Sequence, residues 1–305
     1  MSESKVDRTV FVTLVCTPGE RYRARLLVDS LRAFGGALSH CPVWLFEADP
    51  VAAPCASLAG EGVRILPLQV PDTVRHYYYA AKVAACAQAE AMADPNVRSL
   101  VWLSADCLIV QPPLRFDLDP SVDAAVRPVH VRNVGLDATA PLDDFWSGVY
   151  DAVGVQDIQR TVVTFIGGRR IRAYYNSHIL AVHPARGLLR RWLALFESLV
   201  CDRAFQSCAC QDTLHQVFLH QAALSALLVT AFDPGCVREL PPDYSYPYNL
   251  HHDVPPARRA RALDDLVCVA CEGRTLDPAA VQDIVIHDPL RAWLAAHARG
   301  MQPDT

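Results

Sequence analysis

The chain has 305 residues, of which 51% are hydrophobic and 20% are charged, and its formal net charge is −5. This length allows one large α/β domain or two small ones, and the acidic balance gives no electrostatic footprint for nucleic acid or an anionic membrane. The polar start at residues 1–8 lacks the apolar core of a signal sequence, and no apolar run approaches the roughly 20 residues of a membrane span. We therefore expect a soluble cytoplasmic protein.

Strands and helices alternate over the first 110 residues. Apolar, β-branched stretches predict strands over residues 9–16, 42–47 and 63–68 and a strand that ends at residue 103. Apolar residues at helical spacing predict helices over residues 22–34 and 79–92. Alternation of this kind predicts a mostly parallel sheet that is covered by helices.

The pattern is less regular beyond residue 128. Residues 128–172 are rich in glycine and proline, with a short helix expected around 142–153, and a long segment of this kind inside an α/β domain is usually functional. The rest of the chain predicts a strand over 171–182, helices over 184–199 and 212–228, a short strand over 266–270 and an apolar segment over 281–287. We expect one domain over residues 9–295, with a flexible N-terminus at 1–8 and a tail at 296–305.

The most informative stretch is the apolar run from Arg98 to Val110, which Ser104 and Asp106 interrupt. An unpaired carboxylate is costly inside a buried strand. The economical interpretation is a strand that ends at Leu103, a short turn that presents Asp106, and a second short strand. A carboxylate at the C-terminal end of a central strand lies where open α/β sheets bind ligands. The alternative is a capped surface turn, where aspartate is common.

Cysteine usage and several missing motifs narrow the function further. The eleven cysteines are an odd number, which argues against a complete disulfide framework and fits reduced thiols. Cys208-x-Cys210 and Cys268-Val-Ala-Cys271 could supply four thiolates to a zinc ion, although the apolar surroundings of the second pair favour a strand. No Gly-x-Gly-x-x-Gly, Walker loop or nucleophile elbow occurs, so a dehydrogenase or a hydrolase has little support.

A series of short motifs follows in order between about residues 10 and 290. They are Phe11-Val-Thr-Leu-Val-Cys-Thr17 with Tyr22 and Leu27–Leu31, Lys82, Val101–Val110, Tyr175-Asn-Ser-His-Ile-Leu180, Gln211-Asp212, Leu240-Pro241 with Tyr248-Asn-Leu250, and Ile286-His287. In this order they resemble the glycogenin-like family of nucleotide-diphosphosugar glycosyltransferases. The resemblance implies a GT-A-like α/β fold, with a Rossmann-like, mostly parallel twisted sheet flanked by helices in a single domain.

The resemblance also implies a chemistry and a site. It implies a nucleotide-sugar donor, first of all a UDP-sugar, and an acceptor small molecule or glycan held by residues 128–172. Mn²⁺ or Mg²⁺ would neutralise the leaving diphosphate, with Asp106 and His287 as ligands. The donor-binding residues that it implies are Thr17, Tyr22, Lys82, Ser104, Asp106, Asn176, Asn249 and Arg291, and the catalytic ones are Asp106, His178, Gln211 and Asp212.

The sequence departs from the family pattern at three points. Ser104 replaces the first aspartate of the Asp-x-Asp motif, and a hydroxyl can hydrogen-bond a ribose but coordinates a metal weakly. His178 replaces a glycine, so its imidazole either intrudes on the sugar space or serves as a ligand, general base or acceptor contact. His287 is followed by Asp-Pro-Leu-Arg instead of glycine and lysine, and Arg291 could substitute for that lysine.

Ordinary structural roles remain open beside these. Lys82 could be a snorkelling helix lysine, Tyr22 a core aromatic and His287 a loop cap. The other histidines, His220 and His251-His252 among them, are expected at the surface or in loops. For the whole chain, the alternatives to a metal-assisted transferase are a metal-independent enzyme, an enzyme with an unusual donor or acceptor, and a GT-A scaffold that binds a nucleotide without transfer. Fold alone does not decide among them.

Overall fold

The computed structural model describes residues 8–48, 55–60 and 62–298. Most of the segment expected to form a flexible N-terminus therefore lies outside the described residues, as does the tail from residue 299. The last described element is helix α7 (Leu290–Ala298), which continues through the domain end expected at residue 295.

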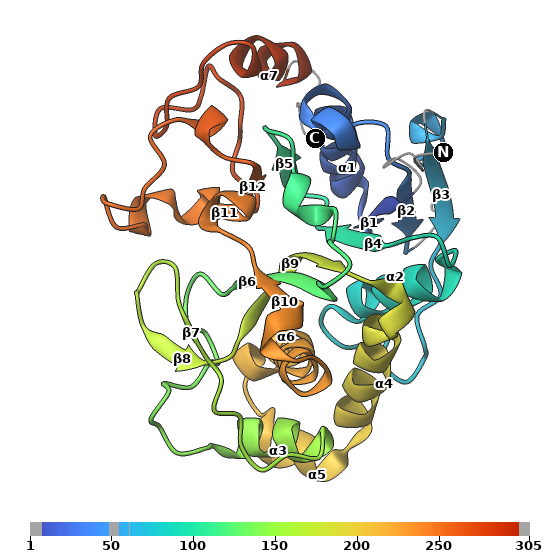
Figure 1. Cartoon of the computed structure of the whole chain (residues 1–305), viewed down its shortest axis with the longest axis vertical. Coiled ribbons are helices and arrows are strands. Elements are labelled where there is room, and N and C mark those ends of the chain that lie inside the picture. The colour runs from blue at the N-terminus through green and yellow to red at the C-terminus, as the bar shows by residue number, and fades with distance from the viewer. Residues whose placement is uncertain (1–7, 49–54, 61, 299–305) are drawn as a thin grey trace.

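A seven-stranded sheet forms the centre of the described part of the chain (Figure 1). Its strands, in spatial order, are β10 (Val237–Glu239), β6 (Ala124–Pro128), β9 (Tyr175–Val182), β4 (Ser99–Leu103), β1 (Thr9–Val15), β2 (Val43–Glu47) and β3 (Val63–Pro67). β9 runs antiparallel to both β4 and β6, and the other neighbours pair in parallel. The sheet is mostly parallel, which confirms the expected fold class.

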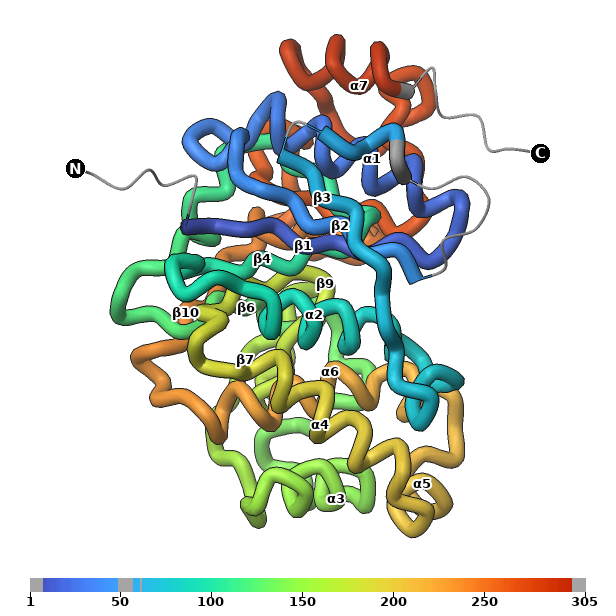
Figure 2. The backbone as a smooth tube through the Cα atoms, turned by 90° about the vertical axis from the view of Figure 1, so that its right-hand side faces the viewer, coloured from blue at the N-terminus to red at the C-terminus, as the bar shows by residue number. Residues whose placement is uncertain are grey.

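Helices cover both faces of the sheet (Figure 2). Side chains alternate across a strand, so in β1 Phe11 and Val15 pack on one side with α1 (Pro18–Phe34), while Val10 and Val12 pack on the other. That other face carries α2 (Ala80–Met92), α4 (Leu188–Cys201) and α6 (Thr213–Ala231), with α3 (Asp144–Ala152) and α5 (Arg203–Ala209) beyond them.

Two small sheets and several short turns complete the fold. A three-stranded sheet has the order β11 (Tyr246–Pro247), β12 (Cys268–Ala270) and β5 (Cys107–Ile109), and a two-stranded one pairs β7 (Thr161–Val163) with β8 (Arg170–Arg172). Turns of 3₁₀-helix span Gly36–Leu38, Cys55–Leu58, Leu114–Phe116, Pro184–Arg186, Pro234–Cys236, Pro242–Tyr244, Tyr248–Asp253 and Leu263–Asp265. Because β12 runs antiparallel to β5, Ala270 pairs with Cys107 and the residues after β12 lie beside Asp106.

Several element boundaries differ from the sequence-based expectations. Helix α1 begins at Pro18 rather than at residue 22, because the Glu20 carboxylate accepts hydrogen bonds from the backbone N–H groups of Cys16 and Thr17 in a capping box. Helix α4 begins at residue 188 rather than 184, because Gly187 takes a left-handed conformation with φ of 66°. The strand expected over 171–182 is divided into β8 and β9, and β6 and α5 were not expected.

Helix α6 is apolar because it lies in the core. By length and composition alone it could cross a membrane, the single such helix within the described residues. Every residue from Leu219 to Leu228 is buried, and the helix contacts β9, α3 and α4. A helix that is apolar on all sides is typical of a protein interior.

The two cysteine pairs considered for zinc do not form a site. Cys268 lies beside Cys107 in the small sheet, whereas Cys210 at the end of α5 lies beside Tyr77. In the part of the chain that the structure describes, no group of three or more His, Cys, Asp or Glu side chains could hold a metal. None of the cysteines in the described part of the chain forms a disulfide.

Replacing Gly148 with alanine is expected to destabilise the contact between α3 and α5. A Cβ atom at this position would lie 2.4 Å from Cδ2 of Phe205, which is buried. Overpacking costs about 1–3 kcal/mol, which exceeds the helix propensity that alanine adds. Thermal unfolding should show a lower Tm for Gly148→Ala, whereas Gly19→Ala, whose Cβ would meet no atom within 4 Å, should unfold at the wild-type temperature or above. An unchanged Tm for Gly148→Ala would contradict this packing.

Candidate functional site

Three adjoining cavities form one cleft along the edge of the sheet where β1 and β4 end and the antiparallel β9 begins. The outer cavity, of about 300 Å³, is lined by Tyr22, Arg23, Leu26, Ala105, Asp106, Cys107, Leu108, Cys271, Gly273, Arg274, Thr275 and Leu276. The central cavity, of about 360 Å³, is lined by Leu14, Glu20, Arg23, Tyr79, Lys82, Trp102, Ser104, Ala105, Asp106, His178 and Glu272. The inner cavity, of about 320 Å³, is lined by Tyr79, Lys82, Val129, His130, Val131, Asn133, Asn176, Ser177, His178, Phe218, His220, Gln221, Asn249, Leu250 and Glu272.

The three cavities share walls, which makes the cleft continuous. Arg23 and Asp106 line both the outer and the central cavity. The central and the inner cavity share four lining residues, Tyr79, Lys82, His178 and Glu272. This edge is where open α/β sheets bind their ligands.

Asp106 lies in the turn between β4 and β5, as the interrupted apolar run predicts. The turn is closed by a hydrogen bond from the Cys107 N–H to the Ser104 carbonyl, and the Ser104 N–H donates to the His178 carbonyl. Burial alone would raise the pKa of Asp106, but its interactions with His178 and Lys82 outweigh burial and lower that pKa below its usual value. Its Oδ1 atom is buried and has no hydrogen-bond partner among the described residues.

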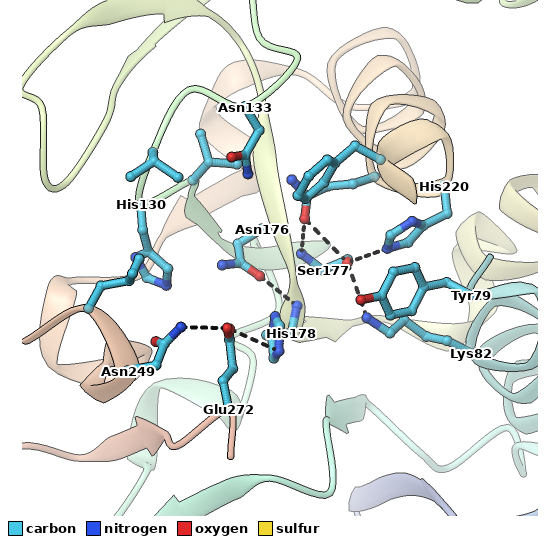
Figure 3. Close-up of a pocket in the computed structure, with 15 residues that line it drawn as sticks. Tyr79, Lys82, His130, Asn133, Asn176, Ser177, His178, His220, Asn249 and Glu272 are labelled. Atoms are coloured by element: carbon cyan, nitrogen blue, oxygen red, sulfur yellow. Dashed lines mark hydrogen bonds and ion pairs between the residues drawn. The ribbon is translucent and has the colours of Figure 1, made fainter. Parts of the chain in front are cut away.

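His178 lies between two carboxylates (Figure 3 shows one of them). Its Nε2 atom is 3.8 Å from Oδ2 of Asp106 and 3.3 Å from Oε1 of Glu272. The other Glu272 oxygen, Oε2, accepts a hydrogen bond of 2.6 Å from Nδ2 of Asn249. Asn176 orients the start of β9, because its Oδ1 accepts a 2.7 Å hydrogen bond from the backbone N–H of His178.

Lys82 carries a buried amino group to the floor of the cleft. Its side chain comes from the first turn of α2, and the residue is 6% exposed. Nζ donates a long hydrogen bond of 3.4 Å to Oγ of Ser177 and lies 4.5 Å from the ring centroid of Tyr79. Lys82 forms no ion pair with any described residue, and burial lowers its pKa. Tyr79 itself has a φ of 59°, an uncommon conformation for a residue other than glycine.

A buried polar network on α6 supports Ser177. Nδ1 of His220 faces the Val217 carbonyl at 2.9 Å, so Nδ1 carries the proton and Nε2 accepts the Ser177 hydroxyl hydrogen at 2.9 Å. Burial, followed by the positive charge of Lys82, holds the pKa of His220 well below its ordinary value, which keeps the imidazole neutral. Gln221 accepts a hydrogen bond of 3.2 Å from the Ser177 N–H. His220 is buried in α6 and only 2% exposed, so its expected position at the surface or in a loop was wrong, whereas His251, also 2% exposed, is buried in the turn Tyr248–Asp253.

His130 forms part of the inner cavity and is 7% exposed. Neither ring nitrogen has a hydrogen-bond partner among the described residues. Burial, with smaller contributions from the positive charges of Arg127 and His178, lowers the pKa of His130 to about 3. The neutral ring therefore offers the cavity one donor and one acceptor.

The structure brings together most of the residues expected to bind a donor. Those at the cleft are Tyr22, Lys82, Ser104, Asp106, Asn176, His178 and Asn249. Tyr22 lines the outer cavity, and its hydroxyl donates a 3.0 Å hydrogen bond to the His297 carbonyl.

Five other expected site residues do not line the three cavities. Thr17 is the N-cap of α1. The Gln211 amide bonds the Ser207 carbonyl, and the Asp212 carboxylate caps α6 through the His215 N–H. The His287 ring pairs with Asp264 at 2.8 Å, and Arg291 lines a separate hollow beside residues 277–279.

Sequence reasoning missed Arg23, Glu272, His220 and Gln221. On α6, the polar pair at the cleft is His220-Gln221 rather than Gln211-Asp212. A polar pair inside the most apolar part of that helix is the signal that could have found it. Glu272 is brought to the cleft by the pairing of β12 with β5, and no local pattern indicates this.

The described residues do not fit the divalent metal that the resemblance implies. Ser104 supplies a hydroxyl where a second carboxylate is expected, and His287 is engaged with Asp264 outside the cavities. Two carboxylates of the cleft, Asp106 and Glu272, both lie within 4 Å of the His178 Nε2 atom. Within the described residues, these three side chains are not arranged as a group that could hold a metal ion.

Comparison with known proteins identifies the class of the fold. A sequence model of the Rhodobacterales glycosyltransferase domain matches residues 12–232. No curated protein matches the sequence. The galactosyltransferase LgtC, solved with donor and acceptor sugar analogues, is similar with a TM-score of 0.53 and 14% identity over 97% of this chain and 98% of that one. Mouse xyloside xylosyltransferase 1 in its apo form gives a TM-score of 0.48 and 10% identity over 88% of this chain and 99% of that one. The similarity to LgtC confirms the expected GT-A fold.

Proposed function

Because this chain belongs to the Rhodobacterales glycosyltransferase domain family and is therefore a glycosyltransferase, we propose that its cleft transfers a sugar from a nucleotide-diphosphate donor, first of all a UDP-sugar. The acceptor is a small molecule or glycan. The observation that carries this proposal is the continuity of the three cavities, which join an apolar-walled outer cavity to a buried amine and a polar inner cavity.

The outer cavity suits the nucleoside of the donor. Tyr22 offers a ring face for a base, and Leu26, Leu108 and Leu276 supply apolar walls. Asp106 lines both this cavity and the central one, so its carboxylate is placed to accept a hydrogen bond from a ribose or sugar hydroxyl. Ser104 offers a second hydroxyl contact in the central cavity.

The central and inner cavities suit the diphosphate, the transferred sugar and the acceptor. Lys82 lines both cavities, as His178 does, and Asn176 lines the inner one. Four residues of the expected acceptor segment line the inner cavity, namely Val129, His130, Val131 and Asn133. In the transfer, the bond between the anomeric carbon and the diphosphate oxygen breaks with its electron pair left on the diphosphate. The acceptor oxygen bonds that carbon and releases its proton to solvent. Positioning and charge stabilisation supply the catalysis.

We expect the nucleotide with the correct base, and its sugars, to raise the Tm of the protein. A ligand at a hundred times its Kd adds roughly 2.7 kcal/mol, which shifts the Tm by several degrees for a domain of this size. The measurement is thermal unfolding with UDP, GDP, CDP, ADP and their sugars, each with Mn²⁺ and with chelator. Asp106→Asn should lose most of the shift, and Asp119→Asn, an exposed carboxylate paired with Arg238, should keep it. If no nucleotide shifts the wild-type Tm, the donor assignment is wrong.

A second candidate function is nucleotide binding without sugar transfer. The position of the His178 ring beside Asp106 and Glu272 favours it, because the family's glycine leaves that space to the sugar. This function predicts a thermal shift with a nucleotide and neither hydrolysis nor transfer of the sugar. Replacing His178 with glycine would then leave the nucleotide shift intact and allow the nucleotide sugar, but not the free nucleotide, to bind more tightly.

A further inference from the structure

The amino group of Lys82 is buried and forms no direct ion pair with a described residue, because the carboxylates of Asp106 and Glu272 act on it only beyond ion-pair distance. Its contacts are the hydroxyl of Ser177 and the face of the Tyr79 ring, both neutral, and no carboxylate of the described chain pairs with it. The nearby His220 ring is neutral and adds no second positive charge, because its Nε2 atom accepts a hydrogen bond from the Ser177 hydroxyl. A buried charge of this kind is costly unless a ligand supplies the opposite charge.

Arg23 adds a second unpaired cation to the same cleft. It lies on α1 one turn after the capping box, lines both the outer and the central cavity, and is exposed. It has no hydrogen-bond or ion-pair partner among residues 8–48, 55–60 and 62–298. Glu20 lines the central cavity as well, but its carboxylate accepts hydrogen bonds from the backbone N–H groups of Cys16 and Thr17 and forms no ion pair with Arg23 in the described part of the chain.

The acidic groups of the cleft already have partners. His178 faces both Asp106 and Glu272, and Asn249 donates to the second oxygen of Glu272. Arg274 in the outer cavity pairs with Asp283, so it is less available than Arg23. The cations of the cleft that form no ion pair with a described residue are Lys82 and Arg23, and both line the central cavity.

We propose that Lys82 and Arg23 bind the diphosphate of the donor directly, and that this cleft needs no divalent metal to do so. This inference rests on the proposed function, which identifies the ligand as a nucleotide-sugar donor. Its metal-free mechanism rests on the finding that the described residues do not fit a divalent metal. Lys82 would contact the phosphate nearer the sugar, because it reaches the inner cavity, and Arg23 the phosphate nearer the nucleoside. A guanidinium can hold a phosphate through two parallel hydrogen bonds.

The test is calorimetric titration of the whole protein with inorganic pyrophosphate in the presence of chelator. We expect binding without metal, a loss of roughly 10-fold in affinity for Arg23→Gln, and a larger loss for Lys82→Gln, as for hydrogen bonds between charged groups. The matched control is Arg25→Gln, which removes an exposed arginine of the same helix that pairs with Asp29, and it should bind as the wild type does. Thermal unfolding of each variant establishes that it is folded.

Three outcomes separate this inference from the proposed function. Pyrophosphate or nucleotide binding that requires Mn²⁺, or equal affinities for Arg23→Gln and Arg25→Gln, would overturn the inference and leave the donor assignment standing. Metal-free pyrophosphate binding that depends on both cations, without binding of any nucleotide, would support the anion site and refute the donor assignment. Titration of Mn²⁺ alone should show no site that Asp106→Asn removes, and such a site would count against the inference.

Discussion

Lys82→Met should make the protein more stable and at the same time abolish sugar transfer. Methionine has nearly the volume of lysine, and it replaces a buried amino group whose pKa burial lowers. Replacing buried ionised groups by well-packed apolar ones stabilises proteins by about 1–4 kcal/mol. Transfer should fall by about 100-fold or more, because the leaving diphosphate loses the cation at its side of the cleft. Urea unfolding and a donor-turnover assay measure the two effects.

The control for Lys82→Met is Arg75→Met, at a surface arginine paired with Asp72, which should change neither quantity. A variant that is stabilised and still transfers sugar would show that Lys82 is a buried helix lysine with no part in the reaction. A variant that is destabilised would show instead that the Ser177 and Tyr79 contacts hold the amine favourably without a ligand.

Lowering the pH from 7 to 5 should destabilise the protein through its buried histidines, and His130 should account for a large part of that change. The folded-state pKa of His130 is about 3, below the unfolded value of about 6.5. Between these values the unfolded chain binds a proton that the folded chain does not, so stability is complete above pH 6.5 and falls as the pH falls. At pH 5 the loss is about 2 kcal/mol for this group.

His130→Gln should flatten the dependence of unfolding free energy on pH, measured by urea unfolding at pH 7 and pH 5. Some dependence remains, because the pKa of His220 is also held low. Replacement of the exposed His40 by glutamine serves as the control and should leave the slope unchanged. Equal slopes for His130→Gln and the wild type would mean that the His130 ring takes up its proton equally in the folded and the unfolded protein, which would contradict the lowered pKa.

The elements that bury a regular apolar pattern could be predicted from the sequence. Strand β1 is buried along its whole length, so its apolar run identifies it without tertiary information. Strand β6 could not be predicted in the same way, because Ala124-Ala-Val-Arg-Pro128 has a single β-branched residue and depends on pairing with β9 and β10. Helix α5 is only one short amphipathic piece, and Asp202 at its N-cap is its main local signal.

Site residues, too, could be predicted from the sequence only where a local pattern places them. Asp106 could be placed because it follows directly from the end of a buried strand, and Lys82 because it opens the helix before that strand. For α6, however, the sequence does not show which turn of the helix lies at the edge of the sheet. Asp212 has the residue type of the motif but serves as a helix cap, and the turn at His220 meets the cleft. Glu272 required a strand pairing across more than half of the chain.

Because the central and inner cavities share lining residues, a molecule bound in one of them changes the affinity of the other for its ligand. Tyr79, Lys82, His178 and Glu272 face both spaces, so a molecule that reorients any of them on one side changes the surface offered on the other. By thermodynamic linkage, the factor by which a bound nucleotide sugar changes acceptor affinity equals the factor by which the acceptor changes nucleotide-sugar affinity. Whichever substrate binds first therefore changes the affinity of the cleft for the other by the same factor.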